Sequence, residues 1–173
     1  MPRATLPIFC KVTFQLAGLQ SRGAAAMLAR LAFFTCEIMK SKPVLELADV
    51  KKIAAAAEAE ALRNHWAVSI AVVDDGGHLL WLQRLEGAAP VSADIAPAKA
   101  STAALGRRDS KGYEDIINGG RSAFLSVRGL PGMLEGGVVA MKDGQCVGAV
   151  GVSGVKSSED AQIAKAGLQA IGL

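Results

Sequence analysis

Residues 66–85 read WAVSIAVVDDGGHLLWLQRL, and this stretch decides the fold. The run 67–73 is apolar and rich in β-branched residues, which favour extended strands. Residues 74–77 are a turn signal, because glycine adopts the positive φ that a tight reversal needs. A second apolar run follows over 78–85. The pattern predicts a β-hairpin whose first strand is central in a sheet and covered on both faces.

A second hairpin is predicted over 137–142 and 146–152, because Asp143–Gly144 is a strong two-residue turn signal between apolar runs. Helical spacing of apolar residues and high alanine content predict helices over 48–64, 92–105 and 158–171, with a short helix near 113–117. Hairpins separated by helices indicate an α+β fold, with an antiparallel sheet flanked by α-helices.

The charge of the chain is unevenly distributed. Residues 1–36 hold four basic residues and no acid, whereas 37–173 hold 15 basic and 16 acidic residues. We therefore expect an atypical N-terminal extension over 1–40, outside a domain that spans 41–173. Three origins stay open for it: a native segment, a targeting segment, or translation from an upstream start. The balanced domain carries no basic stripe, so no nucleic-acid partner is expected.

Cysteine and histidine are scarce. The three cysteines are odd in number and form no C-x-x-C pair, which predicts a reducing, cytoplasmic setting without a disulfide framework. Two histidines in the whole chain argue against a zinc site held by protein ligands alone. The apolar run 23–36 is too short for a membrane span.

Several polar residues in the domain are candidates for chemistry, each with a structural alternative. Asp74 and His78 flank the first turn, where they would transfer protons or hold iron, or where Asp74 would only stabilise the turn. Lys99 lies among alanines and is either solvated or a buried contact for an anion. Arg107 and Arg108 form either a carboxylate clamp or a solvated helix face. Gly151 lies within a strand, where it allows close approach of a helix, a backbone or a flat ligand.

Seven motifs in fixed order resemble the GlcG/HbpS-like family, and most closely its glycolate-operon branch. They are Trp66–Leu80, Arg84, Lys99–Arg108, Lys111–Glu114, Leu134–Val138, Val147–Gly154 and Glu159–Ala161. The resemblance implies a profilin-like domain with about five antiparallel strands that assembles into homo-oligomers. It also implies one of two functions, binding of heme or metabolism of a small acid.

The heme hypothesis takes His78, or alternatively Tyr113, as the iron ligand. Cations for the propionates and further ligand-binding residues would be Arg84, Lys99, Thr102, Arg107, Arg108, Gly151, Ser153 and Gly154. The alternative is a cofactor-independent enzyme, a deaminase, hydrolase or tautomerase acting on a small carboxylic acid such as an aminomuconate. Its catalytic residues would be Asp74, His78, Lys99 and Glu135. Under either hypothesis the motif residues are expected to converge on one pocket that takes heme or a small anion.

Overall fold

The computed structural model describes residues 41–173, so the extension expected over 1–40 lies outside the described residues. The elements follow in the order α2 (Leu47–Arg63), β1 (Ser69–Asp74), β2 (Leu79–Arg84), α3 (Ser92–Gly106), α4 (Lys111–Asn118), the 3-10 helix η1 (Ser122–Ser126), β3 (Gly137–Lys142), β4 (Gln145–Ser153) and α5 (Ser157–Gln169). Both predicted hairpins and the α+β class are confirmed. Within 41–173, no helix has the length and apolar character needed to cross a membrane.

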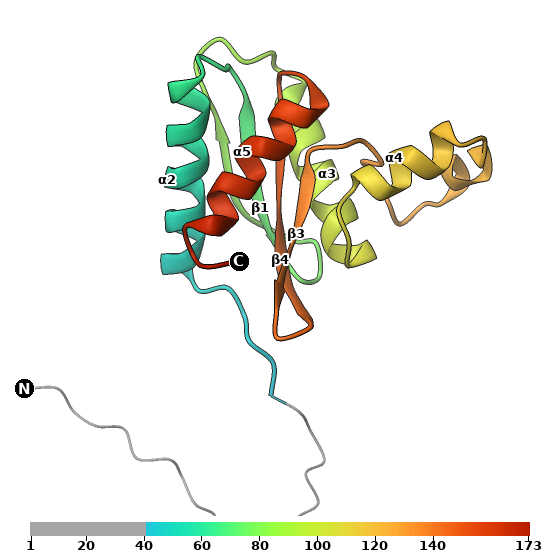
Figure 1. Ribbon diagram of the computed structural model, residues 1–173, viewed down its shortest axis with the longest axis horizontal. Helices are drawn as coiled ribbons and strands as arrows, with labels where there is room; N and C mark the ends of the chain where they lie inside the picture. Colours follow the sequence, from blue (N-terminus) through green and yellow to red (C-terminus); the bar gives the residue numbers. More distant parts are fainter. Residues whose placement is uncertain (1–40) are drawn as a thin grey trace, which may run out of the picture. The chain divides into compact units, whose positions relative to one another are not determined.

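The strands form one antiparallel sheet in the order β2-β1-β4-β3 (Figure 1). The described residues contribute four strands, where the resemblance implied about five. Strand β1 is central, as its uninterrupted apolar run predicted, and its first five residues are buried. At one end of β1, Ser69 pairs with both Arg84 and Ser153, and at the other end Asp74 pairs with Gly148.

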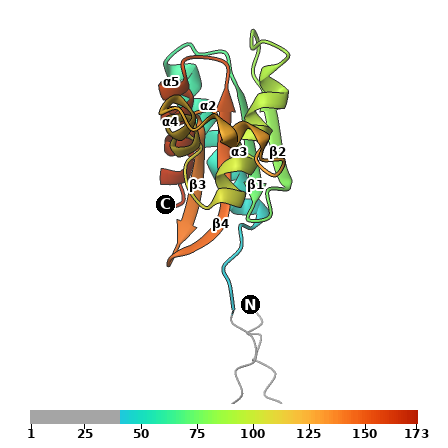
Figure 2. The same cartoon turned by 90° about the vertical axis from the view of Figure 1, so that its right-hand side faces the viewer.

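Helices cover both faces of the sheet (Figures 1 and 2). Helices α2 and α5 bury large side chains, among them Ile53 and Ile163, against one face of the sheet, to which β1 contributes Ile70. Helix α3 covers the other face mainly with alanines, which pack on Val73 and Ala149. Small residues on both α3 and β4 let the two backbones approach closely. This close contact positions the loops at the ends of the sheet.

Helix α4 and η1 project from the body as an arm (Figure 1). Tyr113 joins the arm to the end of α3, because its ring lies against Gly106 and 5.9 Å from the ring of Phe124. Ser110 fastens the base of the arm to β3, since its backbone N–H donates to the Gly137 carbonyl at 2.9 Å. Leu125 in the arm is 68% exposed, so the apolar surface of the arm is only partly covered within the described residues.

Candidate functional site

The turn between β1 and β2 presents His78 on a fixed scaffold. The Asp74 carboxylate accepts hydrogen bonds from the backbone N–H of Gly76 at 2.9 Å and of His78 at 2.8 Å. The same carboxylate oxygen lies 3.3 Å from His78 Nδ1, and the His78 side chain is 82% exposed. Ser101 on α3 donates to the Gly77 carbonyl at 2.7 Å and thereby ties the turn to the helix.

The electrostatics of this turn favour a charged Asp74. Partial burial would raise the pKa of Asp74, but the backbone N–H groups of His78 and Gly76 and the imidazole of His78 outweigh burial and lower the pKa below its ordinary value of 3.8. A carboxylate beside Nδ1 favours the tautomer that carries its proton on Nδ1. The lone pair of His78 Nε2 is then directed away from Asp74 and is available to a metal, which is how carboxylates orient metal-binding histidines.

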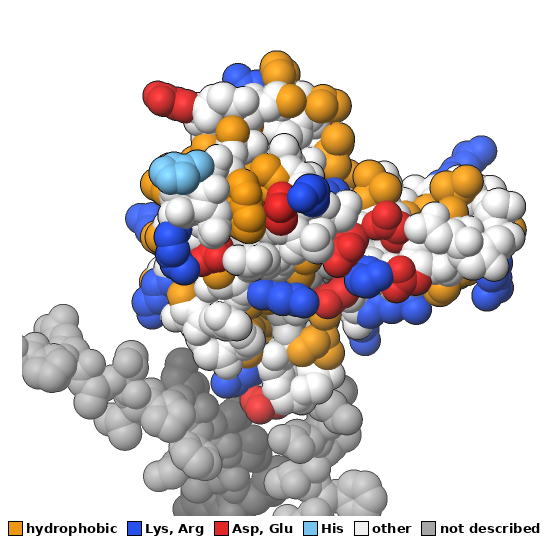
Figure 3. Space-filling model, turned by 45° about the horizontal axis from the view of Figure 1, so that its top comes forward, with side chains coloured by type: hydrophobic (Ala, Val, Ile, Leu, Met, Phe, Trp, Pro, Cys, Tyr) orange, Lys and Arg blue, Asp and Glu red, His pale blue; other side chains and the backbone are white. Residues whose placement is uncertain are grey.

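Exposed leucines lie on β2, which begins beside this imidazole, and on α3 next to the turn. Leu79, Leu80 and Leu82 on β2 are 51%, 40% and 42% exposed, and Leu105 on α3 is 49% exposed and packs against Gly77. Figure 3 brings forward the end of the molecule opposite this turn, and there too hydrophobic side chains reach the surface among the charged ones. An imidazole beside apolar surface has the composition of a heme site, which needs an axial ligand and an apolar face for the macrocycle.

Arg107 lies at the same end of the sheet as this turn. It is the left-handed C-cap of α3, with φ 53°, and it lines a cavity of about 100 Å³ together with Lys42, Asp75 and Cys146. Asp75 pairs with Lys42. Of the predicted site residues, the structure therefore brings together Asp74 and His78, and it places Arg107 in a cavity with Asp75 of the same turn.

Lys99 has a structural partner, and this corrects the expectation that it contacts a ligand anion. Its Nζ donates to the Asp160 carboxylate at 2.8 Å and to the Val152 carbonyl at 3.1 Å. The two side chains are only 4% and 2% exposed. Burial raises the pKa of Asp160, and the hydrogen bond and charge of Lys99 oppose that rise. The pair lies inside the fold, where it fastens α3 to the start of α5.

Three further predicted ligand residues also serve packing. The Thr102 hydroxyl is fully buried and accepts a hydrogen bond from the Gly132 N–H at 2.9 Å. A Cβ on Gly151 would lie 2.1 Å from the Ala96 carbonyl oxygen, so this glycine admits helix α3 rather than a ligand. A Cβ on Gly154 would lie 2.5 Å from the Ala67 carbonyl oxygen, so that glycine admits the neighbouring chain.

Arg84 and Ser153 lie at the opposite end of β1 from His78. Both pair with Ser69, whereas the turn follows Asp74. Ser69 and Asp74, the two ends of β1, are five residues apart, which corresponds to about 17 Å along the strand. Convergence of all motif residues on one intramolecular pocket is thus not what the structure shows.

The remaining candidates are dispersed. The Arg108 guanidinium lies 3.8 Å from the centre of the buried Tyr113 ring, a cation–π contact that occupies both residues. Glu135 lines a groove with Glu60 and Lys165, away from the turn. The four residues proposed for catalysis therefore do not form one cluster in the described part of the chain.

One prominent groove has no counterpart among the features predicted from the sequence. Its volume is about 550 Å³, and it is lined by Glu58, Leu62, His65, Trp66, Ala67, Gln83, Arg84, Leu85 and Glu86. It lies between the end of α2 and the end of β2, on the side of the sheet away from α3. His65 lies just after the end of α2 and has φ 57°, a left-handed conformation that is uncommon for residues other than glycine.

Comparisons with known proteins identify relatives of this chain. The family described as "Haem degrading protein HbpS-like" matches residues 45–169. Protein GlcG of Escherichia coli K12 is 54% identical over 115 residues, which are 66% of this chain and 85% of that protein.

Two solved structures share the fold. A double mutant of HbpS from Streptomyces reticuli has a TM-score of 0.72 and 28% identity, with 92% of this chain and 99% of that chain covered. The PduOC:heme complex has a TM-score of 0.70 and 26% identity, with 75% of this chain and 96% of that chain covered. The chain, from helix α2 to helix α5, thus belongs to the HbpS-like family.

Proposed function

We propose that this protein binds heme, with Nε2 of His78 as a ligand of the iron. The observation that carries the proposal is the arrangement at the β1–β2 turn. His78 is exposed, its Nδ1 faces the charged Asp74 carboxylate, and the strand that follows it carries exposed leucines.

The residues around the β1–β2 turn fit a bound heme. Leu79, Leu82 and Leu105 would cover part of the apolar macrocycle, and Asp74 would hold the imidazole in the tautomer that binds iron. Arg107, exposed at the same end of the sheet, would face a propionate. When bound, heme supplies a redox-active iron, and the residues named here only bind and orient it. The structure of PduOC, a relative with the same fold, is a complex with heme.

Two properties complete the proposal. The protein acts in the cytoplasm, which its odd number of cysteines favours. It also works as a homo-oligomer, which its membership of the family supports.

Titration of the full-length protein with hemin tests the proposal. We expect a Soret band that grows to one heme per chain and then stops, and a coloured protein that keeps its heme through gel filtration. Bovine serum albumin, which binds hemin, serves as the positive control. A protein that leaves gel filtration colourless after incubation with excess hemin would contradict the proposal.

A further inference from the structure

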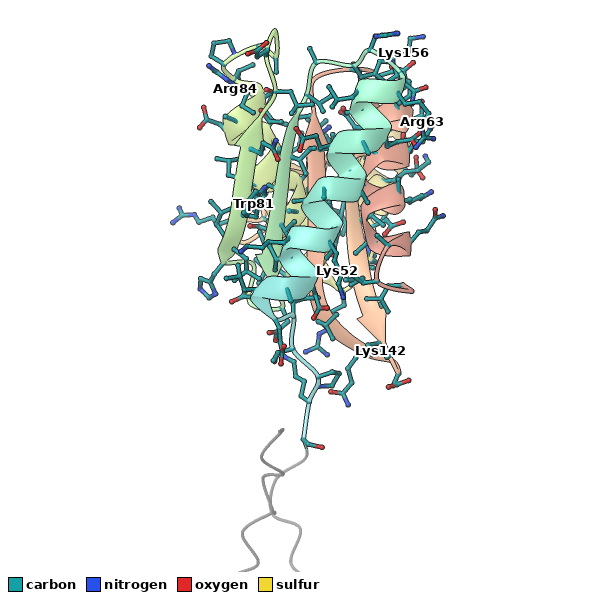
Figure 4. The ribbon with its side chains drawn as sticks, turned by 90° about the vertical axis from the view of Figure 1, so that its left-hand side faces the viewer. Lys52, Arg63, Trp81, Arg84, Lys142 and Lys156 are labelled. Carbon is teal, nitrogen blue, oxygen red and sulfur yellow. The ribbon has the colours of Figure 1, made fainter. Side chains whose placement is uncertain are left out.

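The groove between the end of α2 and the end of β2, the α2–β2 groove, is lined by polar side chains that the fold leaves unengaged. Within residues 41–173, none of the following side chains makes a hydrogen bond or an ion pair with another protein group: Glu58, His65, Trp66, Gln83, Arg84 and Glu86. Figure 4 shows Arg84 at the end of β2, at the same end of the sheet as Arg63, the last residue of α2. Two carboxylates, a guanidinium and an imidazole in this groove are therefore free to contact a ligand.

A second groove, beside α5, has the opposite arrangement. Glu60 lines it and is only 7% exposed. The Glu60 carboxylate accepts hydrogen bonds from Gln162 Nε2 at 2.7 Å and from Asn64 Nδ2 at 3.1 Å, and it pairs with Arg63 at 2.7 Å. These contacts join α2 to α5, so this carboxylate has a structural role. The polar side chains of the α2–β2 groove have no such role within the described residues.

The chain places an imidazole at the α2–β2 groove in a conformation that favours glycine. The backbone N–H of His65 donates to the Leu62 carbonyl at 3.1 Å, and that of Trp66 donates to the Ala61 carbonyl at 2.9 Å. These two hydrogen bonds end α2 in a Schellman motif, whose left-handed residue is usually glycine. Here that residue is His65, with φ 57°. A side chain kept at a left-handed position points to a use for that side chain.

Apolar side chains line the same groove. Trp66 and Leu85 are half-buried and pack against the core, and Leu62 is 58% exposed. Small-molecule sites combine apolar walls with a few polar groups that fix the orientation of the ligand. The α2–β2 groove has this composition, and its volume of about 550 Å³ leaves room for a small organic molecule.

We propose that the α2–β2 groove binds an α-amino acid with a large apolar side chain. Arg84, together with His65, binds the carboxylate, because a guanidinium holds a carboxylate through two parallel hydrogen bonds. Glu58 and Glu86 bind the ammonium group, and Trp66 covers the apolar side chain. A ligand with a negative charge alone would leave both glutamates unpaired, and a ligand with a positive charge alone would leave Arg84 unpaired. A zwitterion satisfies both kinds of group.

Isothermal titration calorimetry on the full chain without heme tests whether both charges are recognised. The probes are L-phenylalanine, 3-phenylpropionate, which lacks the ammonium group, and phenethylamine, which lacks the carboxylate. We expect L-phenylalanine to bind with a dissociation constant below about 1 mM, and each single-charge probe to bind at least about tenfold more weakly. No binding of L-phenylalanine at about 10 mM, or equal affinity for all three probes, would overturn the proposal.

Charge-neutral variants test which side chains bind which group. Arg84→Gln should weaken L-phenylalanine binding at least about tenfold and leave phenethylamine binding unchanged. Glu58→Gln combined with Glu86→Gln should weaken L-phenylalanine binding and leave 3-phenylpropionate binding no weaker than in the wild type. Arg128→Gln is the matched control, because Arg128 is also exposed but lies outside the groove, and it should bind L-phenylalanine as the wild type does.

Circular dichroism shows whether each variant is folded, and the three probes decide the question on the wild type even where a variant does not fold. L-phenylalanine affinity that survives Arg84→Gln, or that falls equally in Arg128→Gln, would overturn the proposal. Hemin binding is not a readout in these experiments, so failure of the heme proposal remains distinguishable.

Discussion

Replacing Lys99 by alanine is expected to lower the free energy of unfolding by about 3–5 kcal/mol, because it leaves Asp160 as a buried charge without its partner. The Lys99 and Asp160 side chains are 4% and 2% exposed, so the carboxylate left without its partner is screened little by bulk water. The Val152 carbonyl would lose its hydrogen bond from Nζ as well. The loss exceeds that of an ordinary surface substitution, which stays within about 0.5 kcal/mol.

Urea unfolding followed by circular dichroism measures this effect. Lys165→Ala is the matched control, because Lys165 is an exposed lysine on a helix and should change stability little. The double variant Lys99→Met with Asp160→Leu should recover most of the stability, since a buried apolar pair replaces a buried ion pair at little cost. A loss below about 1 kcal/mol for Lys99→Ala would show that Asp160 has another partner or that the site is wet.

Gly151→Ala is the second substitution with a large expected effect, a loss of roughly 3 kcal/mol or more. The new Cβ would lie 2.1 Å from the Ala96 carbonyl oxygen and 2.6 Å from the Ala100 backbone nitrogen. Both are backbone atoms of α3, so the helix as a whole has to move away from β4. That movement opens the alanine-rich contact that covers this face of the sheet.

Thermal unfolding of Gly151→Ala beside Gly129→Ala separates this steric effect from the general effect of replacing glycine. A Cβ on Gly129 would meet nothing within 4 Å, so the control should keep wild-type stability or gain slightly. Equal stability of the two variants would mean that α3 does not pack on β4 as closely as described.

The sequence predicted most of the fold because its local signals agree with its long-range contacts. The turns at Asp74–Gly77 and Asp143–Gly144 have the residues that tight hairpins need, and both hairpins form where predicted. The apolar run of β1 correctly predicted a strand covered on both faces. Strand order followed only from the structure, since β1 pairs with β4 across more than 70 residues of sequence.

The candidate site was harder to predict, because a sequence motif indicates which residue types are required but not which contacts require them. Lys99 and Thr102 are constrained by buried partners, Asp160 and Gly132, that no local pattern identifies. For Gly151 the sequence left open the close approach of a helix, a backbone or a flat ligand, and the proximity of the Ala96 carbonyl fits the first of these. Arg84 and His78 lie close in sequence, yet a six-residue strand holds them at opposite ends.

Parallel hemin titrations of His78→Ala and His65→Ala, followed at the Soret band, test the central claim most directly. These are the only two histidines in the chain, so the pair of variants covers every imidazole ligand. His78→Ala should bind hemin at least about tenfold more weakly, a loss of about 1.4 kcal/mol or more, and its Soret band should shift. His65→Ala should match the wild type in both affinity and spectrum. Hemin affinity and spectrum that survive His78→Ala, or that are lost in His65→Ala, would contradict the assignment of His78 as the iron ligand.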